Sequence, residues 1–191
     1  MKSIIVLTLC CMVCGCQFAG TAFTGVRKVS TILLDDRSFK DDFIDIKMNF
    51  SLRDDFIEID PKLGLDIEPT IFEGKVLLTG ALPDIDIIQQ VVETTWKNTN
   101  TKQVYNYIRV DDPPSLDIVN QDAAVSGAIR TQLTFTRGVS SSNYKLTMEN
   151  GTVYIMGIAK DQNELNAVLS VVKDTVGVSK IIPLVRFKNQ G

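Results

Sequence analysis

Cationic and apolar side chains are grouped within a short stretch in the second half of the sequence. The group consists of Ile129, Arg130, Leu133, Phe135, Arg137 and Val139. Guanidinium groups bind phosphate through paired hydrogen bonds, and apolar side chains enter the boundary between lipid headgroups and acyl chains. The group therefore suits contact with a membrane interface. The spacing of Val125, Ile129 and Leu133 also fits an ordinary helix core, so Phe135 and Arg137, which lie beyond it, are the stronger candidates.

The two parts of the chain differ in net charge. Residues 17–114 carry 11 basic and 17 acidic side chains, whereas residues 115–191 carry 8 basic and 6 acidic ones. An anionic lipid surface should therefore repel the first part and attract the second, by about 1 kcal/mol for each basic residue near the surface. The charge asymmetry favours the same part of the chain as the grouped arginines do.

Several classes of function are disfavoured by what the sequence lacks. The chain has a net charge of −3 and no histidine, which excludes Ser-His-Asp and Cys-His catalysis and the commonest zinc sites. It has no glycine-rich phosphate-binding motif, and its acidic balance argues against a nucleic-acid partner. Paired aspartates occur without the spacing of an EF-hand, and we interpret them as a solvated acidic face: Asp35-Asp36, Asp41-Asp42 and Asp54-Asp55. We therefore expect a binding protein without a cofactor and not an enzyme.

The first sixteen residues have the features of a lipoprotein signal peptide. Lys2 precedes an apolar stretch over residues 4–13, which as a helix would rise about 15 Å, roughly half of a bilayer core. The stretch ends in Val13-Cys14-Gly15-Cys16, which resembles a bacterial lipobox, so we expect acylation at Cys16. Gln17 follows instead of the aspartate that signals retention in the inner membrane, which favours the outer membrane. The alternative is an ordinary cleaved signal peptide that happens to contain cysteines.

An internal repeat spans most of the remaining chain. The segment Glu73–Gly80 recurs as Asn150–Gly157, and the same offset of 77 positions pairs Arg109 with Arg186 without a gap. Residues 111–115 contain two consecutive prolines and separate the copies. The predicted organisation is a signal peptide at 1–15, a lipidated linker at 16–36, one domain at 37–111, a linker at 112–119 and a second domain at 120–191.

Each copy contains a predicted hairpin with a recognisable turn sequence. Glu73-Gly74 and Asn150-Gly151 are typical of two-residue type I′ turns between alternating strands. In the second hairpin, Val153 and Ile155 are expected to face the core. Tyr154 and Met156 then lie on the opposite face. If that face is open, two large exposed side chains there require an explanation.

A helix is expected on either side of each hairpin. Residues 44–52 alternate like a strand, but residues 39–50 also fit helical spacing, and the second copy favours helix because Val125, Ile129 and Leu133 are spaced by four. Asp84 and Asp161 are candidate N-caps of the helices after the hairpins. The apolar stripe of the last helix is predicted at Leu165, Val168, Leu169, Val172 and Val176.

A closing strand completes each copy. These strands are expected at residues 104–110 and 181–187, and Pro183 confines the second to a sheet edge or to a bulge at that point. Gly80 and Gly157 are expected to end equivalent hairpin strands, at points where a side chain would clash. The predicted fold class is α+β, with two helices packed on one face of a small mixed sheet in each of two tandem αββαβ domains.

This pattern resembles the BON domain. The resemblance covers nearly the whole chain after residue 16 and is carried mainly by Lys75–Gly80, Val104–Arg109, Arg130–Leu133 and Glu149–Gly157. Two such domains behind a lipobox are similar to the family of dual BON-domain outer-membrane lipoproteins. The resemblance implies no enzyme activity, and it implies binding of anionic phospholipid through the second domain.

The same resemblance bears on two single positions. Tyr154 matches an aromatic position that the family uses at its lipid site. Ala124 stands where the compared family member has a tryptophan, which implies weaker or differently oriented binding because tryptophan prefers the bilayer interface.

The combined prediction is a lipid-anchored protein of the outer membrane that faces the periplasm. It is expected to bind anionic phospholipid through its second domain and to support outer-membrane integrity. The predicted lipid contacts are Ile129, Arg130, Leu133, Phe135, Arg137 and Tyr154, with acylation at Cys16 and no metal. The alternative is a non-enzymatic adaptor that docks on outer-membrane assembly proteins or on cell-wall machinery.

Overall fold

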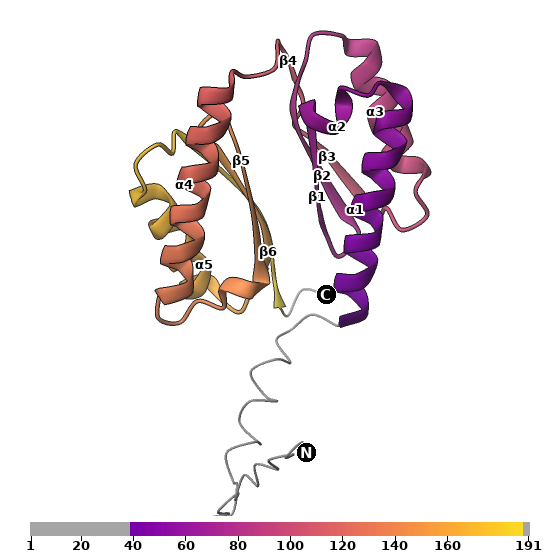
Figure 1. The fold of residues 1–191 in the computed structure, drawn as a ribbon. Helices are drawn as coiled ribbons and strands as arrows, with labels where there is room; N and C mark the ends of the chain where they lie inside the picture. Colours follow the sequence, from indigo (N-terminus) through magenta and orange to yellow (C-terminus); the bar gives the residue numbers. More distant parts are fainter. Residues whose placement is uncertain (1–38, 189–191) are drawn as a thin grey trace, which may run out of the picture. The chain divides into compact units, whose positions relative to one another are not determined.

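A computed structural model describes residues 39–188, which belong to one compact unit. The N-terminal half of this unit contains α1 (Phe39–Ile59), α2 (Leu63–Asp66), β1 (Ile67–Phe72), β2 (Lys75–Leu82), α3 (Ile85–Lys97), β3 (Gln103–Asn106) and β4 (Arg109–Val110). The C-terminal half contains α4 (Leu116–Phe135), a 3₁₀ turn at Ser141–Asn143, β5 (Tyr144–Glu149), β6 (Thr152–Ala159), α5 (Gln162–Asp174) and β7 (Lys180–Phe187) (Figure 1). The predicted order of helix, hairpin, helix and strand therefore occurs twice.

Each half is built on a small mixed sheet. Strand β2 pairs antiparallel with β1 and parallel with β3 and β4, and β6 pairs antiparallel with β5 and parallel with β7. The hairpin register places Leu146 opposite Ile155 and Met148 opposite Val153. Val153 and Ile155 lie in the core, as predicted. Strand β7 is an edge strand, which accommodates Pro183. The mixed α+β class is confirmed.

The two hairpin turns have the backbone that the sequence predicts. Glu73 and Gly74 have φ values of 53° and 77°, and Asn150 and Gly151 have values of 46° and 73°. Positive φ at both central residues defines a type I′ turn. The tight turn thus sets the register of each sheet.

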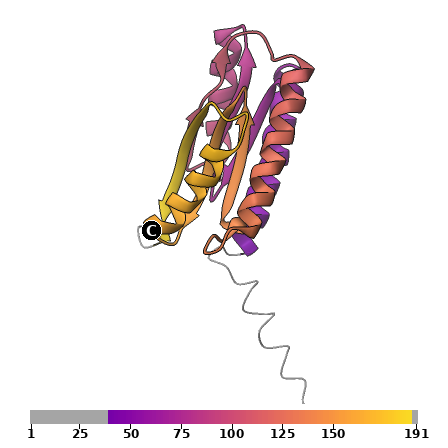
Figure 2. The same ribbon diagram turned by 90° about the vertical axis from the view of Figure 1, so that its left-hand side faces the viewer.

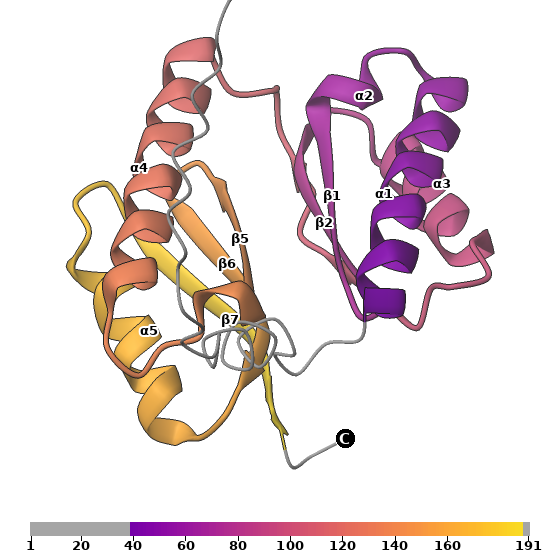
Figure 3. The ribbon, with the colours of Figure 1, turned by 60° about the horizontal axis from the view of Figure 1, so that its bottom comes forward.

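Two helices cover one face of each sheet, as predicted (Figures 2 and 3). In the N-terminal half, α1 buries Met48, Leu52 and Phe56 against the sheet and α3. In the C-terminal half, α4 buries Ile129 and Leu133 together with the apolar stripe of α5. The helices after the hairpins begin at predicted N-caps, whose carboxylates accept hydrogen bonds from the first-turn N–H groups.

The faces opposite the helices are also buried. Phe72 and Leu77 of the N-terminal sheet form one apolar cluster with Tyr154, Met156 and Ile158 of the C-terminal sheet. Tyr154 and Met156 are therefore not exposed, because the sheet of the N-terminal half covers this face.

The contacts between the halves have an approximate two-fold character. The hydroxyls of Thr70 and Thr147, which occupy equivalent repeat positions, lie 2.6 Å apart. Arg186 donates to Glu73 at 2.6 Å, and the equivalent Arg109 donates to Glu149 at 3.2 Å. Contact between equivalent residues is the mark of a self-complementary interface.

Some details of the prediction are wrong. Helix α4 begins at Leu116, within the residues predicted as a linker at 112–119. Val176 is exposed, because α5 ends at Asp174 before the stripe reaches it. Gly80 and Gly157 lie within β2 and β6 instead of ending them, and the strand expected at 104–110 is divided into β3 and β4. The short helix α2 was not predicted.

The predicted signal peptide, the predicted acylation site Cys16 and the predicted linker at 16–36 lie outside the described residues. No helix within residues 39–188 combines the length and the apolar character needed to cross a bilayer. Over the same residues, no group of three or more histidine, cysteine, aspartate or glutamate side chains could hold a metal ion.

Candidate functional site

An open groove of about 1120 Å³ runs between α4 and the edges of both sheets. One wall is a face of α4 that includes Val119, Ala123 and Arg130, and the floor includes Thr70 of β1 and Lys145 of β5. The groove therefore combines small apolar side chains with hydroxyls and two cations.

The strand edges along this groove are covered by side chains. Asn49 Nδ2 donates to the Pro69 carbonyl at 2.6 Å, and Lys145 Nζ donates to the Ile71 carbonyl at 2.6 Å. On the facing sheet, Arg130 Nη2 donates to the Leu146 carbonyl at 2.6 Å. Side chains that cap the carbonyls of an edge strand, and a proline within it, oppose the addition of a further strand.

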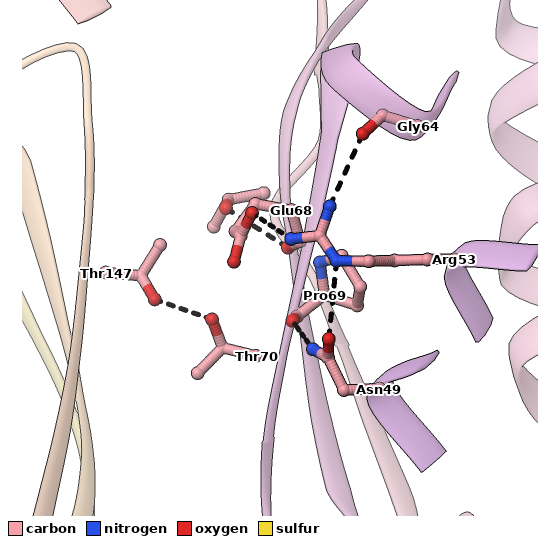
Figure 4. A network of polar contacts seen from close by, with 8 residues as sticks. Asn49, Arg53, Gly64, Glu68, Pro69, Thr70 and Thr147 are labelled. Atoms are coloured by element: carbon pink, nitrogen blue, oxygen red, sulfur yellow. Dashed lines mark hydrogen bonds and ion pairs between the residues drawn. The ribbon is translucent and has the colours of Figure 1, made fainter. Parts of the chain in front are cut away.

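A network around Arg53 holds α1 against β1 (Figure 4). Arg53 Nη1 donates to the Gly64 carbonyl at 3.3 Å, and Nη2 contacts Glu68 at 2.5 Å. Arg53 Nε also donates to Asn49 Oδ1 at 3.3 Å. Arg53 thereby neutralises one of the carboxylates that line the groove.

The carboxylates of the groove are mostly engaged. Glu149 pairs with Arg109, and the buried Asp122 accepts from the backbone N–H groups of Asn150 and Gly151 at 2.5 and 3.1 Å. Arg130, in contrast, donates only to the Leu146 carbonyl among residues 39–188, which leaves further guanidinium N–H groups for a ligand. The groove can therefore receive an anionic group at Arg130.

The six predicted contact residues separate into two sets. Ile129, Leu133 and Tyr154 are buried, the first two in the core and the third between the sheets. Arg130, Phe135 and Arg137 are exposed. Only the second set can reach a ligand at the surface, and the proposal below is confined to it.

Phe135 and Arg137 lie together at the C-terminal end of α4. Phe135 is 83% exposed. Arg137 makes no hydrogen bond or ion pair with any residue in the described part of the chain. A guanidinium here is also favoured by the negative end of the helix dipole. An exposed aromatic ring and an exposed cation two residues apart in the chain can contact apolar and anionic groups at one surface.

The two buried tyrosines near the groove are not acid–base groups at neutral pH. Burial, with a smaller effect of Glu149, raises the pKa of Tyr154, whose ring lies 5.0 Å from that of Tyr107. Burial and then Glu164 raise the pKa of Tyr144 further. Both phenols therefore stay protonated at neutral pH.

Sequence reasoning missed the aspartates that hold the hairpin turns. Asp45 accepts from the N–H groups of Glu73 and Gly74, as Asp122 does in the second half. The repeat offset of 77 pairs Asp45 with Asp122. Aligning the two copies would therefore have shown that both carry an aspartate at this position.

Comparison with known proteins places this arrangement in a family. The model of the BON domain matches residues 121–189. A protein of Anaplasma centrale, described as an uncharacterized protein in the gshII 5′ region, is 38% identical over 120 residues, which cover 62% of this chain and 80% of that protein.

Two further relatives are more distant. Outer membrane lipoprotein DolP of Haemophilus influenzae is 23% identical over 61% of this chain and 60% of that protein. A 21 kDa hemolysin of Actinobacillus pleuropneumoniae is 24% identical over 63% of this chain and 62% of that protein. The chain thus spans about three fifths of the length of these two relatives. It belongs to the BON-domain family, in which its relatives include an outer-membrane lipoprotein.

Proposed function

We propose that this protein is an outer-membrane lipoprotein facing the periplasm, which binds anionic phospholipid and supports outer-membrane integrity. The observation that carries the proposal is the exposure of Phe135 and of Arg137, which has no partner among residues 39–188, with Arg130 in the adjoining groove. These residues belong to the half of the chain with excess positive charge. Phosphate would bind the guanidinium groups, and the ring of Phe135 would enter the headgroup boundary.

The N-terminal half has a different part in the proposal. It has the same order of elements as the half that matches the family, and we propose that it is a second, diverged BON domain. Its excess of acidic side chains opposes contact with an anionic surface. We therefore assign lipid recognition to the C-terminal half alone and no enzymatic step to either half.

Lipid binding can be tested by sedimentation with vesicles, using the chain from residue 17, which keeps the compact unit Leu34–Gly191. We expect binding to phosphatidylglycerol or cardiolipin vesicles but not to phosphatidylcholine. Arg137→Glu changes the local charge by two units, which at about 1 kcal/mol per unit weakens binding about thirtyfold. Addition of Arg130→Glu should weaken binding further. Phe135→Ala should weaken binding without changing its salt dependence, because apolar insertion is not screened.

A matched charge reversal controls for overall charge. Lys62→Glu and Lys97→Glu alter exposed positions of the N-terminal half and should leave vesicle binding nearly unchanged. The single tryptophan, Trp96, lies in α3 of the N-terminal half and is 52% exposed. A blue shift of its fluorescence emission on addition of vesicles would show that the N-terminal half contacts the lipid. Equal binding by wild type and a folded Arg137→Glu variant would reject the proposed site. Failure to bind any vesicle would favour the adaptor alternative.

The proposed anchor predicts a separate result for Cys16. Cys16→Ser should leave an unprocessed or soluble product, because the thiol that receives the acyl chains is lost. Membrane fractionation and gel mobility of the full chain measure the outcome. A variant that stays in the outer-membrane fraction with unchanged mobility would show that Cys16 is not the anchor.

A further inference from the structure

Helix α1 carries a second apolar stripe on the side opposite its core. Met48, Leu52 and Phe56 face the sheet, whereas the second stripe is exposed. Its members are Phe43, Ile46, Phe50 and Ile57, with Phe43 and Phe50 exposed by 68% and 66%. Their spacing of three, four and seven residues is that of the seam of a coiled coil.

The fold itself does not require this stripe. The repeat offset places Ala123 of α4 at the position of Ile46 and Gly127 at that of Phe50. Helix α4 packs on its sheet in the same way without large apolar side chains there. Large exposed apolar side chains at positions where the equivalent helix carries small residues indicate an interaction surface specific to α1.

The seam position between Phe50 and Ile57 is occupied by Arg53. Its guanidinium turns away toward β1, where it binds Glu68 and the Gly64 carbonyl (Figure 4). The charge at this position is thereby satisfied within the chain. The stripe is left as an apolar seam over the rest of α1.

The charges beside the seam favour a particular partner. Lys47 and Asp54 lie on the same edge of the stripe, about 10 Å apart along the helix, and neither has an ion pair within the described residues. Two identical helices that pair antiparallel about a two-fold axis bring the same edges together. Lys47 of one copy would then face Asp54 of the second copy, twice in each pair.

We propose that α1 is a self-association surface, through which two copies of this chain pair with their α1 helices antiparallel. A lipid surface fits less well, because α1 carries three basic and six acidic side chains and anionic lipid would repel it. Two helices of this length bury less area than a standard stable interface, so the pair is weak in solution. The proposed lipid anchor, on which this point alone rests, would raise the effective concentration of the copies in the membrane plane.

Sedimentation velocity over a range of concentrations tests the proposal, using the chain from residue 17. Wild type should show a reversible monomer–dimer equilibrium. Phe50→Ser should raise the dimer dissociation constant at least about tenfold, as removal of a central aromatic contact does. Phe135→Ser, at a phenylalanine on α4 that is more exposed than Phe50, is the matched control and should leave the constant unchanged.

A charge exchange identifies the arrangement. Lys47→Asp and Asp54→Lys should each weaken the dimer, and the double variant should restore it to within about twofold of wild type, because the pairs are reformed between copies. Contact within one chain cannot explain such a rescue, since the two side chains are too far apart in α1.

Three results would overturn the proposal: a wild-type chain that stays monomeric up to about 1 mM, a charge exchange that does not restore the dimer, or a Phe50→Ser variant that loses vesicle binding instead. Arg137→Glu should leave the dimer unchanged. Failure of lipid recognition and failure of self-association are therefore distinguishable.

Discussion

The Gly80→Ala variant is expected to unfold with a free energy about 3 kcal/mol below that of wild type. Gly80 has a φ of 131°, a conformation that residues with a Cβ atom rarely adopt. An added Cβ would also collide with the carbonyl oxygen of Asp66, which is backbone and cannot rotate away. Urea unfolding followed by circular dichroism measures the change.

Gly127→Ala is the matched control for this substitution. Gly127 lies inside α4, and no atom would lie within 4 Å of an added Cβ. Alanine there should raise the free energy of unfolding by about 0.5–1 kcal/mol, because it reduces the backbone entropy lost on folding. Equal stability of Gly80→Ala and wild type would show that the hairpin strand relaxes around the new side chain.

Asp122→Ala is expected to cost about 3 kcal/mol of folding free energy. The buried carboxylate accepts hydrogen bonds from the Asn150 and Gly151 N–H groups, and its removal leaves both donors of the turn unpaired. Hydrogen exchange at these two amides should accelerate more than exchange elsewhere in β5 and β6.

Two variants calibrate this effect. Asp122→Asn keeps one acceptor oxygen and should lose less stability. Asp117→Ala removes an exposed carboxylate from the first turn of the same helix and should cost only a few tenths of a kcal/mol, through the helix dipole. The prediction fails if Asp117→Ala and Asp122→Ala are equally stable.

The features that sequence predicted well are those set by neighbouring residues. The turns at Glu73-Gly74 and Asn150-Gly151 require only local backbone geometry, and the N-caps Asp84 and Asp161 act on the first turn of their own helices. Strand register follows from the turn and from alternation, so the buried Val153 and Ile155 were placed correctly.

The features that escaped prediction depend on residues distant in sequence. Alternation places Tyr154 on the face away from the helices, but it contains no information that the sheet of the other half covers that face. Arg130 could be predicted as a surface cation from its residue type. Its hydrogen bond to the Leu146 carbonyl could not, because that bond depends on how α4 lies along β5. Helical spacing in α1 was visible, but two apolar stripes satisfy it, and only the structure shows which of them is buried.

Thr70 contacts Thr147, which occupies the equivalent position of the repeat. The two halves of one chain are therefore arranged approximately like the two subunits of a homodimer. Either half expressed alone would expose the sheet face that the other half now buries. Covering this face would then require association with a second molecule of the same half. Joining the halves removes the requirement that both remain alike. The outer faces of the two equivalent helices do differ, because α1 carries Ile46 and Phe50 where α4 carries Ala123 and Gly127.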